Sequence, residues 1–185
     1  AVWINGRLSL THSRLVGSEP SLALLTLKEG YAHHNAALTQ HIAQAWGNTP
    51  DVLAALNTLL YEEGVFLYIK PHSVLDKPLI LHHLVDARQQ PVSTAPRCLV
   101  VAGQHSHTSL LAIEHTLGTQ PSLTNAYTQV ILERAACLNH HTLQIQDSEQ
   151  AHQVHHLSFI QREQSTLNTY CFTWGGALVR NNLHI

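Results

Sequence analysis

The chain has 185 residues, of which 44% are hydrophobic and 12% are charged. This composition supports one folded domain with a buried core and excludes a disordered chain, and no apolar run approaches the roughly 20 residues that span a bilayer. Ten Lys and Arg against 12 Asp and Glu give a formal net charge of −2, and the basic residues form no stripe that would bind nucleic acid. Histidine is abundant, with 16 copies.

The beginning of the chain and its cysteines favour a trimmed protein of a reducing, cytoplasmic compartment. The sequence contains no methionine, and its opening AVWINGRLSL has neither the basic region nor the apolar stretch of a signal peptide. Cys98, Cys137 and Cys171 are odd in number and widely spaced, which fits neither a disulfide framework nor a zinc site. We expect three free thiols that are buried as small hydrophobic side chains.

The first predicted section runs from Ala1 to Gly64, and it is mostly helical. Val2 to Ile4 is a short strand that enters a turn at Asn5-Gly6. Between Asn35 and Trp46 the apolar residues recur with helical spacing, which predicts one amphipathic helix. A second helix is predicted to open at Thr49-Pro50, with its apolar residues on one face before Gly64. That face consists of Val52, Leu56, Leu59 and Leu60.

The second section, residues 65 to 185, has short apolar runs separated by polar elbows, and these runs repeat. Aligning the elbows places Ile69, Val101, Ile131 and Ile160 at equivalent positions. The interval between them is nearly constant at about 30 residues, which lies in the range of known structural repeats. A unit of strand, elbow and strand cannot bury its own apolar face, so successive units are expected to stack.

Three architectures fit such a repeat: a parallel β-solenoid, a β-sandwich with regular hairpins and a small propeller. No Asn-Gly or Asp-Gly hairpin turn follows Gly64, and propeller blade signatures are missing. The elbows Gln104 to Ser106 and Glu133 to Ala135 suit the corners of a solenoid, which do not have to reverse the chain within two residues. We therefore favour the solenoid.

The histidines invite a search for a metal site, but their spacing argues against one. Adjacent pairs occur at 33–34, 82–83, 140–141 and 155–156, and neighbouring side chains on a strand point to opposite faces. Only His105 and His107 have the spacing of a ligand pair on one face, with Glu114 and His115 further along, and this arrangement departs from the cupin metal motif. We expect these four side chains to be polar elbow residues in solvent, and most of the other imidazoles to be exposed.

Catalytic patterns are also missing from the sequence. Gly175-Gly176 lacks a phosphate-binding frame, and no nucleophile elbow occurs. A carbohydrate-active β-helix enzyme would need two or three carboxylates in a cleft, and only Asp147 and Glu149 could share a face, in an expected loop. The acids of the repeat region are Asp76, Asp86, Glu114, Glu133, Asp147, Glu149 and Glu163. We therefore expect a scaffold or assembly subunit with no catalytic residue, no resident cofactor and no metal ligand, and not an enzyme.

Several segments together resemble the SufB/SufD family of iron–sulfur cluster assembly proteins. They are ALNTLLYEEG followed by VFLYIKPHSVLDKPLIL, then PRCLVVAGQHS, LTNAYTQVILERAACLNHHTLQ and the terminal FTWGGALVRNNLHI, and they occur in the family's order. The lead-in VWINGRLS and the helical section before Gly64 look most like the SufD branch.

The resemblance implies a right-handed parallel β-helix core over 65–185 and a role as a non-enzymatic scaffold. It implies that SufB and the ATPase SufC are partners, with ATP bound by SufC, in the cytoplasm. The family's cluster-assembly positions and SufC-docking helices are expected beyond Ile185, so no cluster-ligating role is assigned to Cys171 or His184. The last coil, with Leu178 and Leu183, is expected to be uncovered and to allow self-association. A histidine-rich metal-binding β-solenoid remains the alternative, and a carbohydrate-active enzyme is the less favoured one.

Overall fold

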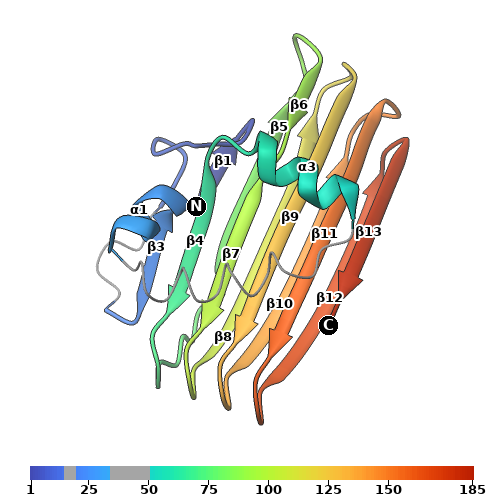
Figure 1. Ribbon diagram of the computed structural model, residues 1–185. Helices are drawn as coiled ribbons and strands as arrows, with labels where there is room; N and C mark the ends of the chain where they lie inside the picture. Colours follow the sequence, from blue (N-terminus) through green and yellow to red (C-terminus); the bar gives the residue numbers. More distant parts are fainter. Residues whose placement is uncertain (15–19, 34–50) are drawn as a thin grey trace.

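In the computed structural model of the chain, two β-sheets lie face to face and wind into a β-solenoid of about four turns (Figure 1). The structure describes residues 1–14, 20–33 and 51–185. The parallel β-helix that the repeat predicted is therefore confirmed, and the molecule is mainly β.

Each sheet takes one strand from every coil. Sheet A has the order β12-β10-β8-β5-β1-β2, and its strands are β1 (Val2–Ile4), β2 (Arg7–Leu8), β5 (Leu79–Asp86), β8 (His107–Leu117), β10 (Cys137–Gln146) and β12 (Thr166–Gly175). Sheet B has the order β13-β11-β9-β7-β4-β3, and its strands are β3 (Leu22–Thr26), β4 (Gly64–Ile69), β7 (Arg97–Ala102), β9 (Ser122–Leu132), β11 (Ala151–Gln161) and β13 (Leu178–His184). The short strand β6 (Val92–Thr94) pairs with β9, and the helices are α1 (Leu27–His33) and α3 (Val52–Leu60).

The strand register confirms the repeat and corrects its first interval. Val101 pairs with Ile131, and Ile131 pairs with Ile160, as the alignment of the elbows predicts. Ile69, however, pairs with Ala102, and the partner of Val101 is Tyr68. Because side chains alternate along a strand, this shift of one residue changes the face. Ile69 therefore points into the solenoid, while Val101 and Ile131 belong to an apolar cluster on the outer face of sheet B.

Tight turns at one end of the solenoid connect sheet B to sheet A. Each turn has one residue with a positive φ: His72, His105, Ala135 and Gln164. Backbone hydrogen bonds join equivalent turns, such as His72 N to Gln104 O at 2.8 Å and Ala135 N to Glu163 O at 2.9 Å. The turns therefore stack as regularly as the strands do.

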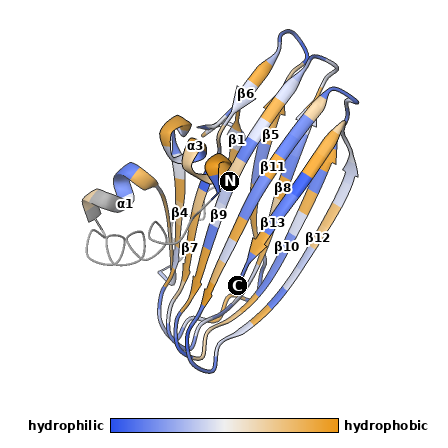
Figure 2. Ribbon diagram, turned by 45° about the vertical axis from the view of Figure 1, so that its right-hand side comes forward, coloured by the Kyte–Doolittle hydropathy of each residue, from blue (hydrophilic) through white to orange (hydrophobic). Residues whose placement is uncertain are grey.

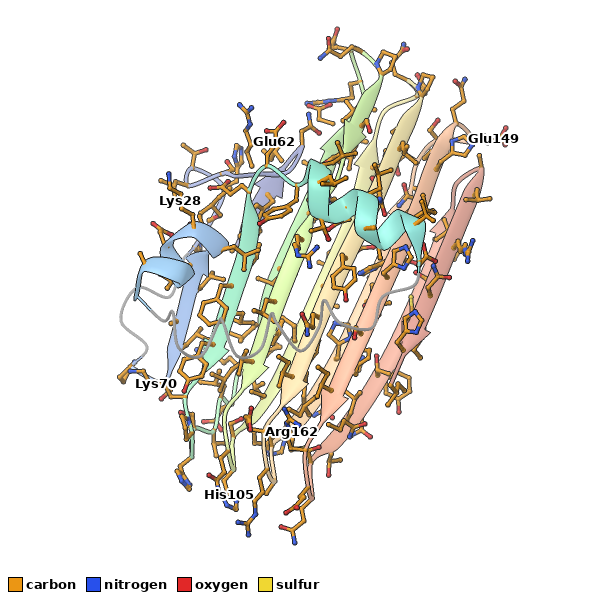
Figure 3. The ribbon with its side chains drawn as sticks, in the orientation of Figure 1. Lys28, Glu62, Lys70, His105, Glu149 and Arg162 are labelled. Atoms are coloured by element: carbon orange, nitrogen blue, oxygen red, sulfur yellow. The ribbon has the colours of Figure 1, made fainter. Side chains whose placement is uncertain are left out.

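The interior next to these turns is apolar. Ile69, Ala102 and Leu132 end their strands there and pack with Leu110 and Leu138 of the opposite sheet. The parts of β7 and β9 toward the turns are hydrophobic, and the turns themselves are hydrophilic (Figure 2). The labelled turn residues lie at one end of the molecule, and Glu149 lies at the other (Figure 3).

The structure confirms helix α3 but corrects its start. Its N-cap is Asp51, whose carboxylate accepts a hydrogen bond from Leu53 N at 2.8 Å, so the helix begins two residues after the predicted Thr49 cap. The helix lies across the outer face of sheet B (Figure 1). The four residues of the predicted apolar face are exposed, with Val52 at 78% and Leu59 at 82%. The buried residues of α3 are Ala54 and Asn57.

The N-terminal section continues both sheets in its described part. The predicted strand at Val2–Ile4 and the turn at Asn5-Gly6 are present, and β1 pairs in parallel with β5. Strand β3 adds to the edge of sheet B in antiparallel orientation. The predicted helix between Asn35 and Trp46 lies outside the described residues, and the division of the chain at residue 64 stays a prediction. Neither described helix is long and apolar enough to cross a membrane.

Candidate functional site

One inward-facing row of residues crosses sheet A from the first strand to the last. Trp3 pairs with His83, His83 with Glu114, Glu114 with Gln144, and Gln144 with Thr173. The positions share one face because the strands are parallel and in register. The interior of the solenoid is therefore apolar next to the turns, and farther from the turns each of β1, β5, β8, β10 and β12 contributes one hydrogen-bonding side chain to this row.

The centre of this row is a buried carboxylate with three polar neighbours. Glu114 is 8% exposed, and its Oε1 lies 3.0 Å from Nδ1 of His155, which projects inward from sheet B. Its Oε2 accepts hydrogen bonds from the side-chain amides of Gln144, at 3.0 Å, and of Gln153. We call Glu114, Gln144, Gln153 and His155 the luminal cluster. It links the two sheets through their interior.

The luminal cluster determines the charge of Glu114. Burial alone raises the pKa of this carboxyl group, but the neighbouring His155 and the hydrogen bond from Gln144 outweigh burial and lower the pKa to about 2. Glu114 is therefore ionised at neutral pH. Two further inward histidines are neutral there, because burial lowers the pKa of His83 and that of His140 to about 4.

The cluster extends to the last coil through the other end of Gln144. Its Oε1 accepts hydrogen bonds from the Thr173 hydroxyl at 2.7 Å and from Asn181 Nδ2 at 3.0 Å. Its Nε2 also donates to Asn181 Oδ1 at 2.9 Å, so the two amides pair reciprocally. The Cys171 thiol donates to the same Oε1 at 3.5 Å, and burial raises its pKa. This thiol is therefore protonated at neutral pH, and it is not an activated nucleophile.

The structure separates the residues that the sequence grouped around His105. His105 and His107 are exposed at the turn end, as predicted. Glu114 is not an elbow residue in solvent: that prediction is wrong, because the residue lies inside β8 on its inward face. His115 is partly buried on the outer face and lies 3.3 Å from Asp147.

The three adjacent histidine pairs on described strands do face opposite sides, but the expectation of solvent for most of the imidazoles is corrected; the pair at 33–34 lies partly outside the described residues. His140 and His155 face the interior and are at most 1% exposed. His156 is also 1% exposed, because it lies on the outer face near the N-cap Asp51 of α3, with 3.8 Å between Nε2 and Oδ1. A strand residue is buried on both faces wherever a helix covers the outer face of its sheet.

The remaining candidates form no reactive group within the described residues. Asp147 and Glu149 are exposed in the loop between β10 and β11, as expected. In the described ranges, no three His, Cys, Asp or Glu side chains are placed to hold a metal ion. The cysteines are free, but their predicted burial is only partly right: Cys98 and Cys137 are partly buried, and Cys171 is exposed.

The luminal cluster could have been found from the repeat. His83, Glu114, Gln144 and Thr173 follow one another along the chain at nearly the same interval as the elbows. Aligning the strands, and not only the elbows, would have placed these residues in one row. The contact with His155 comes from the opposite sheet, and no spacing within the sequence indicates it.

With the fold and the cluster described, the chain can be compared with known proteins. The molecule is a parallel β-solenoid with a polar interior row. The model of the SufBD core domain, described as SUF system FeS cluster assembly, matches residues 83–185, from within β5 through β13. The chain therefore belongs to the SufB/SufD family, whose system assembles iron–sulfur clusters. A search of curated proteins finds no match.

Proposed function

We propose that this chain is a non-enzymatic scaffold subunit of the SufD type that supports iron–sulfur cluster building. The observation that carries the proposal is the match to the SufBD core domain over 83–185, which covers more than half of the chain. The lead-in VWINGRLS and the segment before Gly64 favour the SufD branch over SufB. Iron and clusters are the cargo of this system.

The proposed partners are SufB and the ATPase SufC, acting in the cytoplasm. A subunit that binds no nucleotide itself depends on a partner to supply the energy of ATP hydrolysis. The described residues support a scaffold role, because the buried carboxylate inside the solenoid is satisfied by the protein's own side chains. Glu114 is enclosed by Gln144, Gln153 and His155.

A pull-down with separate partners tests the proposal. The full-length protein, carrying an affinity tag, is co-expressed with SufC and either a SufB or a SufD homologue. We expect SufB and SufC to be recovered in stoichiometric amounts, and SufD not to replace SufB. Recovery of SufD in place of SufB would assign the chain to the other branch. Recovery of neither would contradict the proposed role.

An iron titration of the purified chain distinguishes the scaffold from the metal-binding alternative. We expect no tight stoichiometric binding, since the described residues provide no group of three metal ligands. Tight binding of one iron per chain would favour the histidine-rich metal-binding reading.

A further inference from the structure

The outer face of sheet A presents a block of apolar side chains on the side of the solenoid opposite the described helices. Those helices lie against sheet B, where α3 contacts β9 and α1 contacts β3 and β4. The outward positions of β5, β8, β10 and β12 within 80–84, 111–115, 141–145 and 170–174 lie in register. We call these twelve side chains, three from each strand, the outer apolar face.

The outer apolar face is regular because parallel strands in register place equivalent side chains next to one another. Its middle row consists of His82, Ile113, Leu143 and Phe172. In the row nearer the turns, the rings of His141 and Tyr170 stack with 5.4 Å between their centres. Nine of the twelve side chains are aliphatic or aromatic and three are histidines, so the face contains no Lys, Arg, Asp or Glu.

Polar side chains border this face at both ends of its strands. Toward the turns, Asn168 Nδ2 donates to Asn139 Oδ1 at 2.9 Å, and Asn139 Nδ2 donates to Ser109 Oγ at 3.3 Å. At the other end, Asp86 forms an ion pair with Arg88 at 2.7 Å. These polar groups are already partnered within the chain. An apolar centre with a polar rim is the usual composition of a protein–protein interface.

The area of the face suits a stable dimer. Tyr170, Phe172 and Trp174 are 55%, 60% and 79% exposed, and together they offer roughly 400 Å² of accessible surface, since an aromatic side chain buries about 150–250 Å². The nine other side chains are partly or largely exposed and bring the face to on the order of 800 Å². The largest apolar patch on a monomer is typically about 300–600 Å², whereas each partner in a stable complex buries about 800 Å².

The charge and the shape of the face favour a second copy of the same chain over a membrane. Surfaces that lie on membranes usually combine apolar side chains with Lys or Arg, and this face contains neither. A two-fold dimer brings the same patch of both copies together, so the patch must be complementary to itself. Two uncharged sheet faces meet this condition, because their side chains interdigitate and no charge is buried without a partner.

We propose that the outer apolar face is an interface between two copies of this chain, which pack sheet against sheet. This interface is distinct from pairing at the open strand edges of β12 and β13, which would extend the solenoid. The proposal goes beyond the proposed scaffold function and does not depend on it.

Sedimentation equilibrium of the Leu183→Lys chain at pH 7 isolates this interface, because the added charge weakens pairing at the strand edge of the last coil. We expect a monomer–dimer equilibrium in the micromolar range and no larger species. In this background, Phe172→Lys should raise the dissociation constant by about 100-fold or more, since each dimer would bury two unpaired charges. The matched control Leu59→Lys adds the same charge to α3 and should leave the dissociation constant unchanged.

Trp174 lies on the face and provides an independent readout through quenching of its fluorescence by acrylamide. In the Leu183→Lys chain, quenching should decrease as the protein concentration rises, because dimerisation covers this exposed indole. Trp174→Phe should remove the concentration-dependent part of the signal. Phe172 is 60% exposed, so the fold is expected to tolerate Lys there. If circular dichroism shows that Phe172→Lys does not fold, Trp174→Lys replaces it in the sedimentation experiment.

Three results would overturn the proposal. The first is a Leu183→Lys chain that stays monomeric at all concentrations. The second is a folded Phe172→Lys or Trp174→Lys variant that dimerises as strongly as its parent. The third is a monomeric chain whose Trp174 is shielded from acrylamide by zwitterionic lipid vesicles, which would assign the face to a lipid surface.

Discussion

His140 and His141 are adjacent in sequence but differ in environment. His140 faces the interior, is fully buried and contacts the edge of the Phe159 ring at 5.5 Å between ring centres. His141 faces outward and stacks on Tyr170 at 5.4 Å. Alternation along the strand therefore puts two identical side chains in different environments, and burial lowers the pKa of the inward His140 to about 4.

Folding stability should fall as the pH decreases from about 6.5 to 4. His140 has a pKa of about 4 in the folded chain and an unfolded value of 6.5, so the unfolded state binds more protons between these values. The loss of folding stability reaches about 3 kcal/mol, because a change of one unit in pKa corresponds to about 1.36 kcal/mol. We expect urea denaturation at pH 7, 5.5 and 4.5 to show this slope.

The neighbouring residue provides the control for this pH dependence. His140→Gln should flatten the slope of stability against pH, because its side chain does not titrate. His141→Gln makes the same substitution on the outward-facing neighbour, which stacks on Tyr170, and is the matched control. His83 contributes in the same direction, since its pKa is also lowered to about 4. A slope unaffected by His140→Gln would show that this imidazole is charged or solvated in the folded chain.

Glu114→Gln should destabilise the fold by about 3 kcal/mol, because the hydrogen bonds that a buried carboxylate accepts are lost and their donors are left unsatisfied. The NH2 group of the new Gln side chain would face the N–H donors of Gln144 and Gln153, or else His155, where the carboxylate oxygens now accept hydrogen bonds or lie close to the ring. Glu149→Gln, in an exposed loop, should change stability by less than about 0.5 kcal/mol. Urea denaturation at pH 7 measures both variants, and equal stabilities would contradict a structural role for the carboxylate.

At the scale of elements, α3 is attached to the solenoid through its polar side. Asn57 Nδ2 donates to Asn125 O at 2.7 Å and to Pro96 O at 3.0 Å, and Asn57 Oδ1 accepts from Arg97. Asn125 Nδ2 in turn donates to Leu53 O at 2.8 Å. These bonds satisfy polar groups that the helix would otherwise bury unpaired, and they explain why its apolar face can lie outward.

Asn57→Ala should therefore destabilise the chain by about 2 kcal/mol or more, because it removes three buried or partly buried hydrogen bonds, to Pro96 O, Asn125 O and Arg97. Leu59→Ala should change stability by less than about 0.5 kcal/mol, since Leu59 is 82% exposed. The urea midpoints of the two variants test this order. The reverse order would mean that the apolar face of α3 packs against the protein.

At the scale of the whole molecule, the solenoid ends at two open strand edges within the described residues. Strands β12 and β13 are the terminal strands of their sheets, and Leu178, Leu183 and Ile185 are 49%, 52% and 77% exposed. Unpaired edges next to apolar side chains are ready to pair with another chain. The self-association expected from the sequence stays a prediction, and this edge is where it would take place.

Sedimentation of the chain is expected to show concentration-dependent association. Leu183→Lys, on the terminal strand, should weaken it by placing charge on that edge. Leu59→Lys places the same charge on the exposed face of α3 and should leave association unchanged, which separates the two surfaces. A monodisperse monomer at all concentrations would contradict the prediction.

The sequence by itself was sufficient to predict the repeat, the solenoid fold and the polar turns that lie in solvent. Each of these depends on local chain properties: alternation along strands, elbow composition and a nearly constant repeat interval. The match of Val101 with Ile131 and Ile160 follows from that interval alone. The inward-facing row that contains Glu114 and Gln144 also recurs at a nearly constant interval along the chain, although an alignment of the elbows alone does not reveal it.

Only the tertiary structure decided which polar residues are buried and what satisfies them. His155 meets Glu114 from the opposite sheet, and α3 covers His156 while turning Leu59 outward. The hydrophobic periodicity of α3 gives the helix one apolar face, but it does not say which face meets sheet B. The structure places Asn57 against the sheet, where it hydrogen-bonds to Pro96 O, Asn125 O and Arg97. These partners lie 39 to 68 residues away along the chain, so only the folded chain brings them to the helix.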